Sequence, residues 1–235
     1  MLDLIGFFTR LPCGNSSIDK AAEYSFLLPI LGGLIGLIVG IFSLFVFNYL
    51  DGLLAALLTI VAVYLITGLN HLDGLADFAD GMYTSGSKQR RIEAMKDVQT
   101  GIAGVTIVLF SILFLVYAIF MINGDVYKII VAEIGAKTGM LFALFIGKPM
   151  KSGLGKVFIE NLNKTVVPFS ILFSLVISFV LLQIMGIITV IVSICVSLVM
   201  VIVAHRAFGK VNGDVLGAIN EVSRIVSLYA LLLIV

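Results

Sequence analysis

Long apolar runs, separated by short polar segments, constrain most strongly how this chain can fold. The runs cover residues 24–48, 53–69, 102–122, 128–147, 166–184, 187–204 and 215–235. A helix needs about 20 predominantly apolar residues to cross a bilayer. The mean hydropathy of +1.18 and a charged fraction of only 12% exclude an ordinary soluble domain. We therefore predict an all-α, polytopic integral membrane bundle of about seven transmembrane helices.

Basic residues lie on one side of these predicted helices. With the N-terminus inside, the inner segments 1–23, 70–101, 148–165 and 205–214 hold twelve Lys and Arg residues. The outer connections 49–52, 123–127 and 185–186 hold none. This excess predicts a multi-pass protein of the cell membrane, with its N-terminus and active site cytoplasmic and its C-terminus outside. No internal repeat is visible, so we expect a single domain over residues 1–235.

The stretch "NHLDGLADFADG", Asn70–Gly81, concentrates negative charge beside an apolar run. Asp73, Asp77 and Asp80 have the spacing i, i+4 and i+7, which places them within an arc of roughly 60° on one helix face. Like charges so arranged repel one another, and a divalent cation would offset that repulsion. The helix dipole alone explains only Asp73. We therefore predict a Mg²⁺ site, because Mg²⁺ binds carboxylate oxygens and leaves positions for substrate phosphates.

A basic segment, "SKQRRIEAMKDV", follows this motif. It is explained either by the positive-inside rule alone or by binding of a diphosphate substrate next to the metal. In the second interpretation Arg90, Arg91 and Lys96 bind phosphate oxygens and Asp97 supplies a fourth metal ligand. The combination favours phosphoryl chemistry at the membrane.

Two further polar stretches are predicted on the same side. "GKPMKSGLGKVF" contains Gly153 and Gly155, whose backbone amides together with nearby lysines suit a phosphate, although a lone GxG is weak support. "AHRAFGKVNGDVLGAINEVSR" brings Arg206 and Asp214, and Glu221 follows Asp214 by seven residues on much the same helix face.

Several ionisable residues fall inside or next to the apolar runs. Glu133 with Lys137 (i, i+4) and Glu221 with Arg224 (i, i+3) are opposite-charge pairs that either cement helix packing or line a site. If the helix extends back to residue 71, His71 lies opposite the aspartate stripe. We then expect it to cap the helix or to contact the substrate.

The motifs "GLNHLDGLADFADG", "RRIEAMKDVQTGIAG", "SGLGKVF" and "NGDVLGAINE" closely resemble those of the cobalamin synthase (adenosylcobinamide-GDP ribazoletransferase) family. The early "FFTRLP" and "LLPILGGLIGLIVG" also look like the start of that family, so the resemblance covers about residues 5–230. This chain departs from the family pattern at Lys137, where arginine is expected, and at Asn212, where threonine is usual. Neither departure removes a carboxylate.

The resemblance implies an enzyme that transfers the phosphocobinamide group of adenosylcobinamide-GDP to α-ribazole or its 5′-phosphate, releases GMP, and requires Mg²⁺. The lipid bilayer is the expected environment, no nucleic acid is expected, and the sequence leaves open whether the chain forms a homo-oligomer. The metal ligands are predicted to be Asp73, Asp77, Asp80 and Asp97, with Asp214 as the alternative to Asp97 and with Asp80 as the alternative acceptor of the nucleophile's proton. The predicted catalytic residues are Asp80, Lys96 and Asp214. The predicted substrate-binding residues are Arg10, His71, Arg90, Arg91, Lys137, Gly153, Gly155, Arg206, Asn212 and Glu221.

Other functions fit the sequence less well. A CDP-alcohol phosphotransferase carries DGxxAR and a later GxxxDxxxD, but here "DGLAD" places Asp77 at the position of the arginine and the later motif is missing. A membrane prenyltransferase normally has two Asp-rich motifs on a larger helix bundle, whereas this sequence shows only one such motif. An ion-coupled transporter tends to hold its acids near the midplane between repeated halves, whereas here they cluster at one face.

Overall fold

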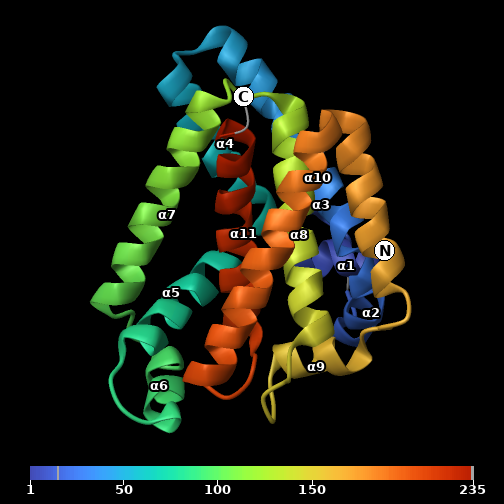
Figure 1. The fold of residues 1–235 in the computed structure, drawn as a ribbon. Helices are drawn as coiled ribbons and strands as arrows, with labels where there is room; N and C mark the ends of the chain where they lie inside the picture. The colour runs from blue at the N-terminus through green and yellow to red at the C-terminus, as the bar shows by residue number, and fades with distance from the viewer. Residues whose placement is uncertain (15, 234–235) are drawn as a thin grey trace.

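The structure is a computed structural model that describes residues 1–14 and 16–233, and all regular structure within these ranges is helical (Figure 1). The predicted all-α class is confirmed. The elements are α1 (Leu2–Phe8), α2 (Ile18–Glu23), the 3-10 helix η1 (Tyr24–Leu27), α3 (Leu28–Tyr49), α4 (Gly52–Thr67), α5 (Asn70–Tyr83), α6 (Lys88–Met95), α7 (Ile102–Met121), α8 (Val126–Ile146), α9 (Leu154–Asn161), α10 (Val167–Ala207) and α11 (Gly213–Leu233).

Five helical stretches among the described residues are long and apolar enough to cross a membrane: Ile18–Tyr49, α7, α8, α10 and α11. The chain is therefore a multi-pass membrane protein, but the predicted count of seven is not confirmed. α4 joins α5 at a bend of 95°, and a sixth span requires these two helices to be counted as one. We treat α5 as lying outside the spans, because 14 residues rise only about 21 Å and the hydrocarbon core is about 30 Å thick.

The predicted helices 166–184 and 187–204 are the two arms of α10. The helix is interrupted at Leu182 and Gln183, and Gln183 has a φ of +53°. Figure 1 shows the chain reversing direction at this break, so that both arms run down from the upper end of the bundle. Gly186 permits the reversal, because a side chain there would collide with the carbonyl of Ser178.

The polar segments gather at one end of the bundle. Figure 1 shows α5, α6, α9 and the connection from α10 to α11 at the lower end. The short connections from α3 to α4 and from α7 to α8, and the break in α10, lie at the upper end. This is the grouping of inner and outer segments that the distribution of basic residues predicts. The site therefore has to be sought at the lower end.

α8 forms the centre of the bundle, and most of its residues are buried. α3 packs closely against it through Gly32, Gly36 and Gly40, where added side chains would meet Glu133, Ile130 and Val126. Small residues at such spacing let membrane helices approach closely. The lipid-facing helices are different, since α7 exposes large apolar residues such as Leu113 and Phe110.

Candidate active site

Two glycines bring α5 and α11 into close contact. A Cβ atom at Gly74 would lie 2.9 Å from the Cα of Asp214, and a Cβ atom at Gly217 would lie 3.1 Å from the Cα of His71. Larger residues at these positions would push the helices apart. The glycines of "HLDGLAD" and "NGDVLGAIN" therefore place the aspartate stripe of α5 beside Asp214 in the first turn of α11.

The carboxylates where α5 crosses α11, hereafter the crossing, interact electrostatically. Asp77 is half-buried, and burial together with the carboxylates of Asp214, Asp73 and Asp80 raises the pKa of Asp77 to about 7. A raised pKa means that the ionised form is disfavoured by its surroundings. The site consequently favours the arrival of a cation or a proton.

Asp80 has a structural partner of its own. Its carboxylate accepts hydrogen bonds from the backbone N–H groups of Gly101 (2.7 Å) and Gly104 (2.8 Å) at the start of α7. A negative charge at a helix N-terminus is stabilising. A Cβ atom at either glycine would collide with this carboxylate. Asp80 thus fixes α7 to α5, and its roles as metal ligand and proton acceptor stay predictions.

The loop before α11 orients Asp214. Asn212 accepts a hydrogen bond from the N–H of Val215 (3.0 Å) and donates one to Asp214 Oδ2 (2.6 Å). Its amide also donates to the Sδ of Met95 at the end of α6 (3.2 Å). Lys96, the next residue, is close enough to Asp214 to interact with its charge. The structure therefore brings the predicted residues Asn212, Asp214 and Lys96 together.

A cavity of roughly 240 Å³ opens beside the crossing and is lined by His71, Asp73 and Asp214. Gly155 also lines it, and a Cβ atom there would lie 2.7 Å from the carbonyl carbon of Asn212, so this glycine lets α9 pack on the loop. Gly153 precedes α9 with a φ of +102°. The remaining lining is mainly apolar and comes from Phe7, Phe8, Thr67, Asn70, Met140, Leu144, Leu154, Phe158, Gly213 and Leu216.

Comparisons with known proteins agree with the motifs that form this site. The family described as "Cobalamin-5-phosphate synthase" matches residues 1–232. The chain belongs to this family. No solved structure matches it.

Several relatives are similar over nearly their whole length. A protein of Pyrococcus furiosus named adenosylcobinamide-GDP ribazoletransferase is 37% identical over 225 residues, which is 95% of each chain. A protein of the same name from Methanococcoides burtonii is 32% identical and covers 96% of this chain and 89% of the relative. One from Thermococcus kodakarensis is 33% identical over 100% of this chain and 98% of the relative.

In this member of the cobalamin-5-phosphate synthase family, the basic residues predicted to bind substrate do not lie together. Arg91 and Arg206 line an open pocket together with Lys88, away from the cavity lining, and Arg90 is exposed. Arg10 covers the bend between α4 and α5, where its backbone N–H donates to the carbonyl of Ile66 (2.7 Å). The substrate-binding roles of these arginines stay predictions.

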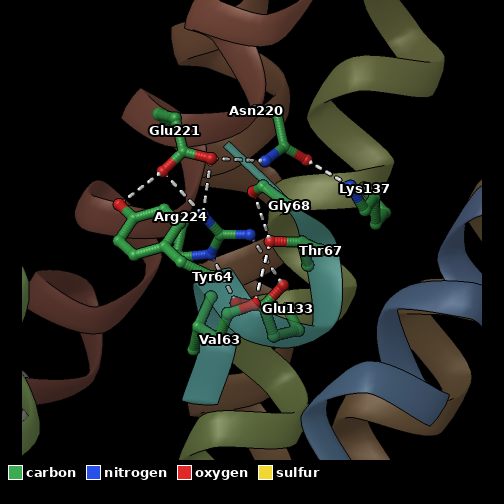
Figure 2. Close-up of polar contacts among 9 residues, drawn as sticks. All are labelled: Val63, Tyr64, Thr67, Gly68, Glu133, Lys137, Asn220, Glu221 and Arg224. Carbon is green, nitrogen blue, oxygen red and sulfur yellow. Dashed lines mark hydrogen bonds and ion pairs between the residues drawn. The ribbon is translucent and has the colours of Figure 1, made fainter. Parts of the chain in front are cut away.

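The buried charges of the bundle form one network (Figure 2). Arg224 donates to both carboxylate oxygens of Glu221 (2.6 Å each) and also pairs with Glu133. Tyr64 donates to Glu221 (3.1 Å). Asn220 connects this group to Lys137, donating to Glu221 (3.0 Å) and accepting from the Nζ of Lys137 (2.8 Å).

One of the two predicted ion pairs is wrong. Glu221 and Arg224 are paired as predicted, but Glu133 pairs with Arg224 rather than with Lys137. The bidentate guanidinium satisfies two carboxylates that would otherwise be buried and unpaired. Glu221 and Lys137 are buried in this network and are not among the cavity-lining residues, so their contact with substrate stays a prediction.

The residues at the crossing fit Mg²⁺ as a pair of carboxylates rather than as a closed cage. No group of three or more His, Cys, Asp or Glu side chains within residues 1–14 and 16–233 converges to hold a metal ion. Mg²⁺ is commonly bound by one or two protein carboxylates plus waters and substrate phosphates. Asp73 and Asp77, one turn apart on α5, have this chemistry. Asp97 is exposed and accepts a hydrogen bond from the N–H of Gln99 (3.0 Å), and its metal role stays a prediction.

Sequence reasoning missed the aromatic side of the cavity. Phe8 and Phe158 line it, but a chain with 17 phenylalanines offers no signal that singles them out. Gly74 and Gly217 were also missed, although both lie inside the motifs that identify the family. The available signal was their spacing from the aspartates: Gly74 directly follows Asp73 and precedes Asp77 by three residues, and Gly217 follows Asp214 by three residues.

Proposed function

We propose that this chain transfers the phosphocobinamide group of adenosylcobinamide-GDP to α-ribazole or its 5′-phosphate and releases GMP. The observation that carries this proposal is that Asp73 and Asp214 line one cavity, with Asp77 one helical turn from Asp73, in a member of a family whose relatives bear that enzyme name.

The residues of the crossing suit this step. A ribose hydroxyl of the acceptor attacks the phosphorus next to cobinamide, a P–O bond forms, and the P–O bond to GMP breaks. The hydroxyl proton passes to a carboxylate, and we assign this role to Asp214 because it lines the cavity. Lys96 lies near Asp214, and its positive charge stabilises negative charge on the diphosphate.

Asp73 and Asp77 are the residues that would hold Mg²⁺. When bound there, Mg²⁺ would supply positive charge to offset that of the diphosphate. The raised pKa of Asp77, which is caused by burial and by the carboxylates of Asp214, Asp73 and Asp80, supports this assignment.

The proposed setting is the cell membrane, with the N-terminus and the polar end of the bundle in the cytoplasm. The basic residues of the predicted inner segments support this orientation, and these segments share one end of the molecule.

The test uses detergent-purified protein with adenosylcobinamide-GDP, α-ribazole and Mg²⁺, assayed for GMP and for the cobalamin product. We expect equal amounts of both products, none in EDTA, and none from Asp77→Asn, which should remain folded. Asp19→Asn, an exposed carboxylate on α2, is the matched control and should retain turnover. Failure of folded wild-type protein to form either product would overturn the proposed function, and turnover by Asp77→Asn would overturn the metal role.

A further inference from the structure

The cavity where α5 crosses α11 is lined by aromatic residues, which form one wall, as well as by carboxylates. Phe7 and Phe8 come from α1, and Phe158 comes from α9. The ring centroid of Phe158 lies 4.8 Å from that of Phe7 and 5.5 Å from that of Phe8. Aromatic rings at such separations pack favourably and present flat apolar surface. The phosphoryl transfer itself does not require this wall.

The wall is held in place on both sides. The ring of Phe8 stacks on His71 with 5.9 Å between centroids and 20° between planes. The Nζ of Lys137 lies 5.3 Å from the centroid of Phe8, a cation–π contact. The start of the chain is also tied down, because Asp3 accepts a hydrogen bond from the N–H of Ser17 (2.9 Å). The surface is therefore preformed.

His71 lines the same cavity and carries a buried polar atom that has no partner within residues 1–14 and 16–233. It is 8% exposed, lines the cavity, and its Nδ1 has no hydrogen-bond partner among the described residues. A buried polar atom without a partner costs free energy, and a ligand would recover that cost if the imidazole turned this nitrogen toward the cavity.

The cavity selects by size and polarity. Pockets for drug-sized ligands measure about 300–1,000 Å³, so a cavity of roughly 240 Å³ admits one small flat group and not a corrin macrocycle. Its lining of Phe, Met and Leu suits a base that is largely apolar, and its polar lining residues are few: Thr67, Asn70, His71, Asp73 and Asp214. A dimethylbenzimidazole nucleoside, the structure that the name α-ribazole denotes, has a single free ring nitrogen.

We infer that this cavity binds the benzimidazole base of the acceptor between Phe8, Phe158 and α8, with His71 facing its polar edge and the ribose directed to Asp73 and Asp214. This inference rests on the proposed function. It assigns the acceptor to the cavity and leaves the cobinamide and guanosine parts of the other substrate outside it.

The first test either removes one aromatic side chain of the wall or fills the cavity. It measures the KM for α-ribazole and the KM for adenosylcobinamide-GDP. Phe158→Ala should raise the KM for α-ribazole at least tenfold and leave the KM for adenosylcobinamide-GDP within twofold. Leu144→Phe, which fills the cavity from α8, should have the same effect by excluding the base. The matched control is Phe173→Ala, since Phe173 lines another apolar cavity that has no carboxylate or histidine.

The outcomes separate this inference from the proposed function. An active wild type whose Phe158→Ala and Leu144→Phe variants change only the KM for adenosylcobinamide-GDP, or neither KM, would overturn the inference alone. A folded but inactive wild type would overturn the proposed function itself. Because one variant enlarges the cavity and the other fills it, failure of one to fold leaves the other decisive.

The second test concerns His71 and uses an acceptor analogue in which the free ring nitrogen is replaced by CH. Equilibrium binding to the protein is followed by the fluorescence of the base. We expect His71→Phe to weaken binding of α-ribazole about tenfold and to leave binding of the analogue unchanged. An equal loss for both ligands would show that His71 does not contact the ring nitrogen.

Discussion

At the scale of single residues, aspartates of one motif have different surroundings. Asp80 accepts two backbone N–H groups of α7, whereas Asp77 lies among other carboxylates that raise its pKa to about 7. The i, i+4, i+7 spacing predicted the shared stripe, because helix geometry alone determines it. It did not predict that the last member faces α7, because only the tertiary arrangement brings Gly101 and Gly104 to that carboxylate.

Asp80→Asn should therefore destabilise the fold and Asp77→Asn should not. The asparagine leaves one backbone N–H at the start of α7 without an acceptor, and loss of such a cap costs about 1–2 kcal/mol. Asp77 has a folded-state pKa above its unfolded value, so its ionisation lowers stability as pH rises from about 4 through about 7, and the amide removes that penalty. Thermal unfolding in detergent with EDTA at pH 8 measures both; a larger loss for Asp77→Asn would contradict this division of roles.

At the scale of helices, the crossing of α5 and α11 depends on glycines, and the buried network depends on Arg224. Gly74→Ala places a Cβ atom 2.9 Å from the Cα of Asp214, so the helices must separate. We expect turnover to fall at least tenfold and stability to fall by about 1–3 kcal/mol, the usual cost of overpacking. Gly33→Ala is the matched control, because its Cβ atom would lie 3.6 Å from Ile134, an ordinary contact. Equal activity in the two variants would show that the close crossing is not needed.

Arg224→Met should be far more damaging than removal of a surface cation. The variant leaves Glu133 and Glu221 buried with one cation fewer, and breaking a buried ion pair costs about 3–5 kcal/mol. Lys156→Met is the comparison, because Lys156 pairs with Glu160 at 3.8 Å on the surface, where an ion pair contributes about 0–1 kcal/mol. Retained unfolding temperature in purified Arg224→Met protein would refute a stabilising role for the network.

At the scale of the whole molecule, composition and charge predicted the membrane bundle and the grouping of its polar segments. Both follow from solvent preference, which is a local property of the sequence. The bend between α4 and α5, the number of spans and the cavity depend on contacts between distant segments, such as Arg10 with the bend and α9 with the loop before α11. Hydropathy carries no information about these contacts.

The orientation of the bundle gives a prediction that involves both of its ends. In a functional background without Cys13 and Cys195, single cysteines replace Ser85, between α5 and α6, or Asn123, between α7 and α8; both positions are exposed. A membrane-impermeant maleimide should label Asn123→Cys in intact cells and Ser85→Cys only after the membrane is opened, because the polar end carries the basic residues. The reverse pattern would place the aspartates outside the cell, where an intracellular GDP-activated corrinoid could not reach them, and would contradict the proposed orientation.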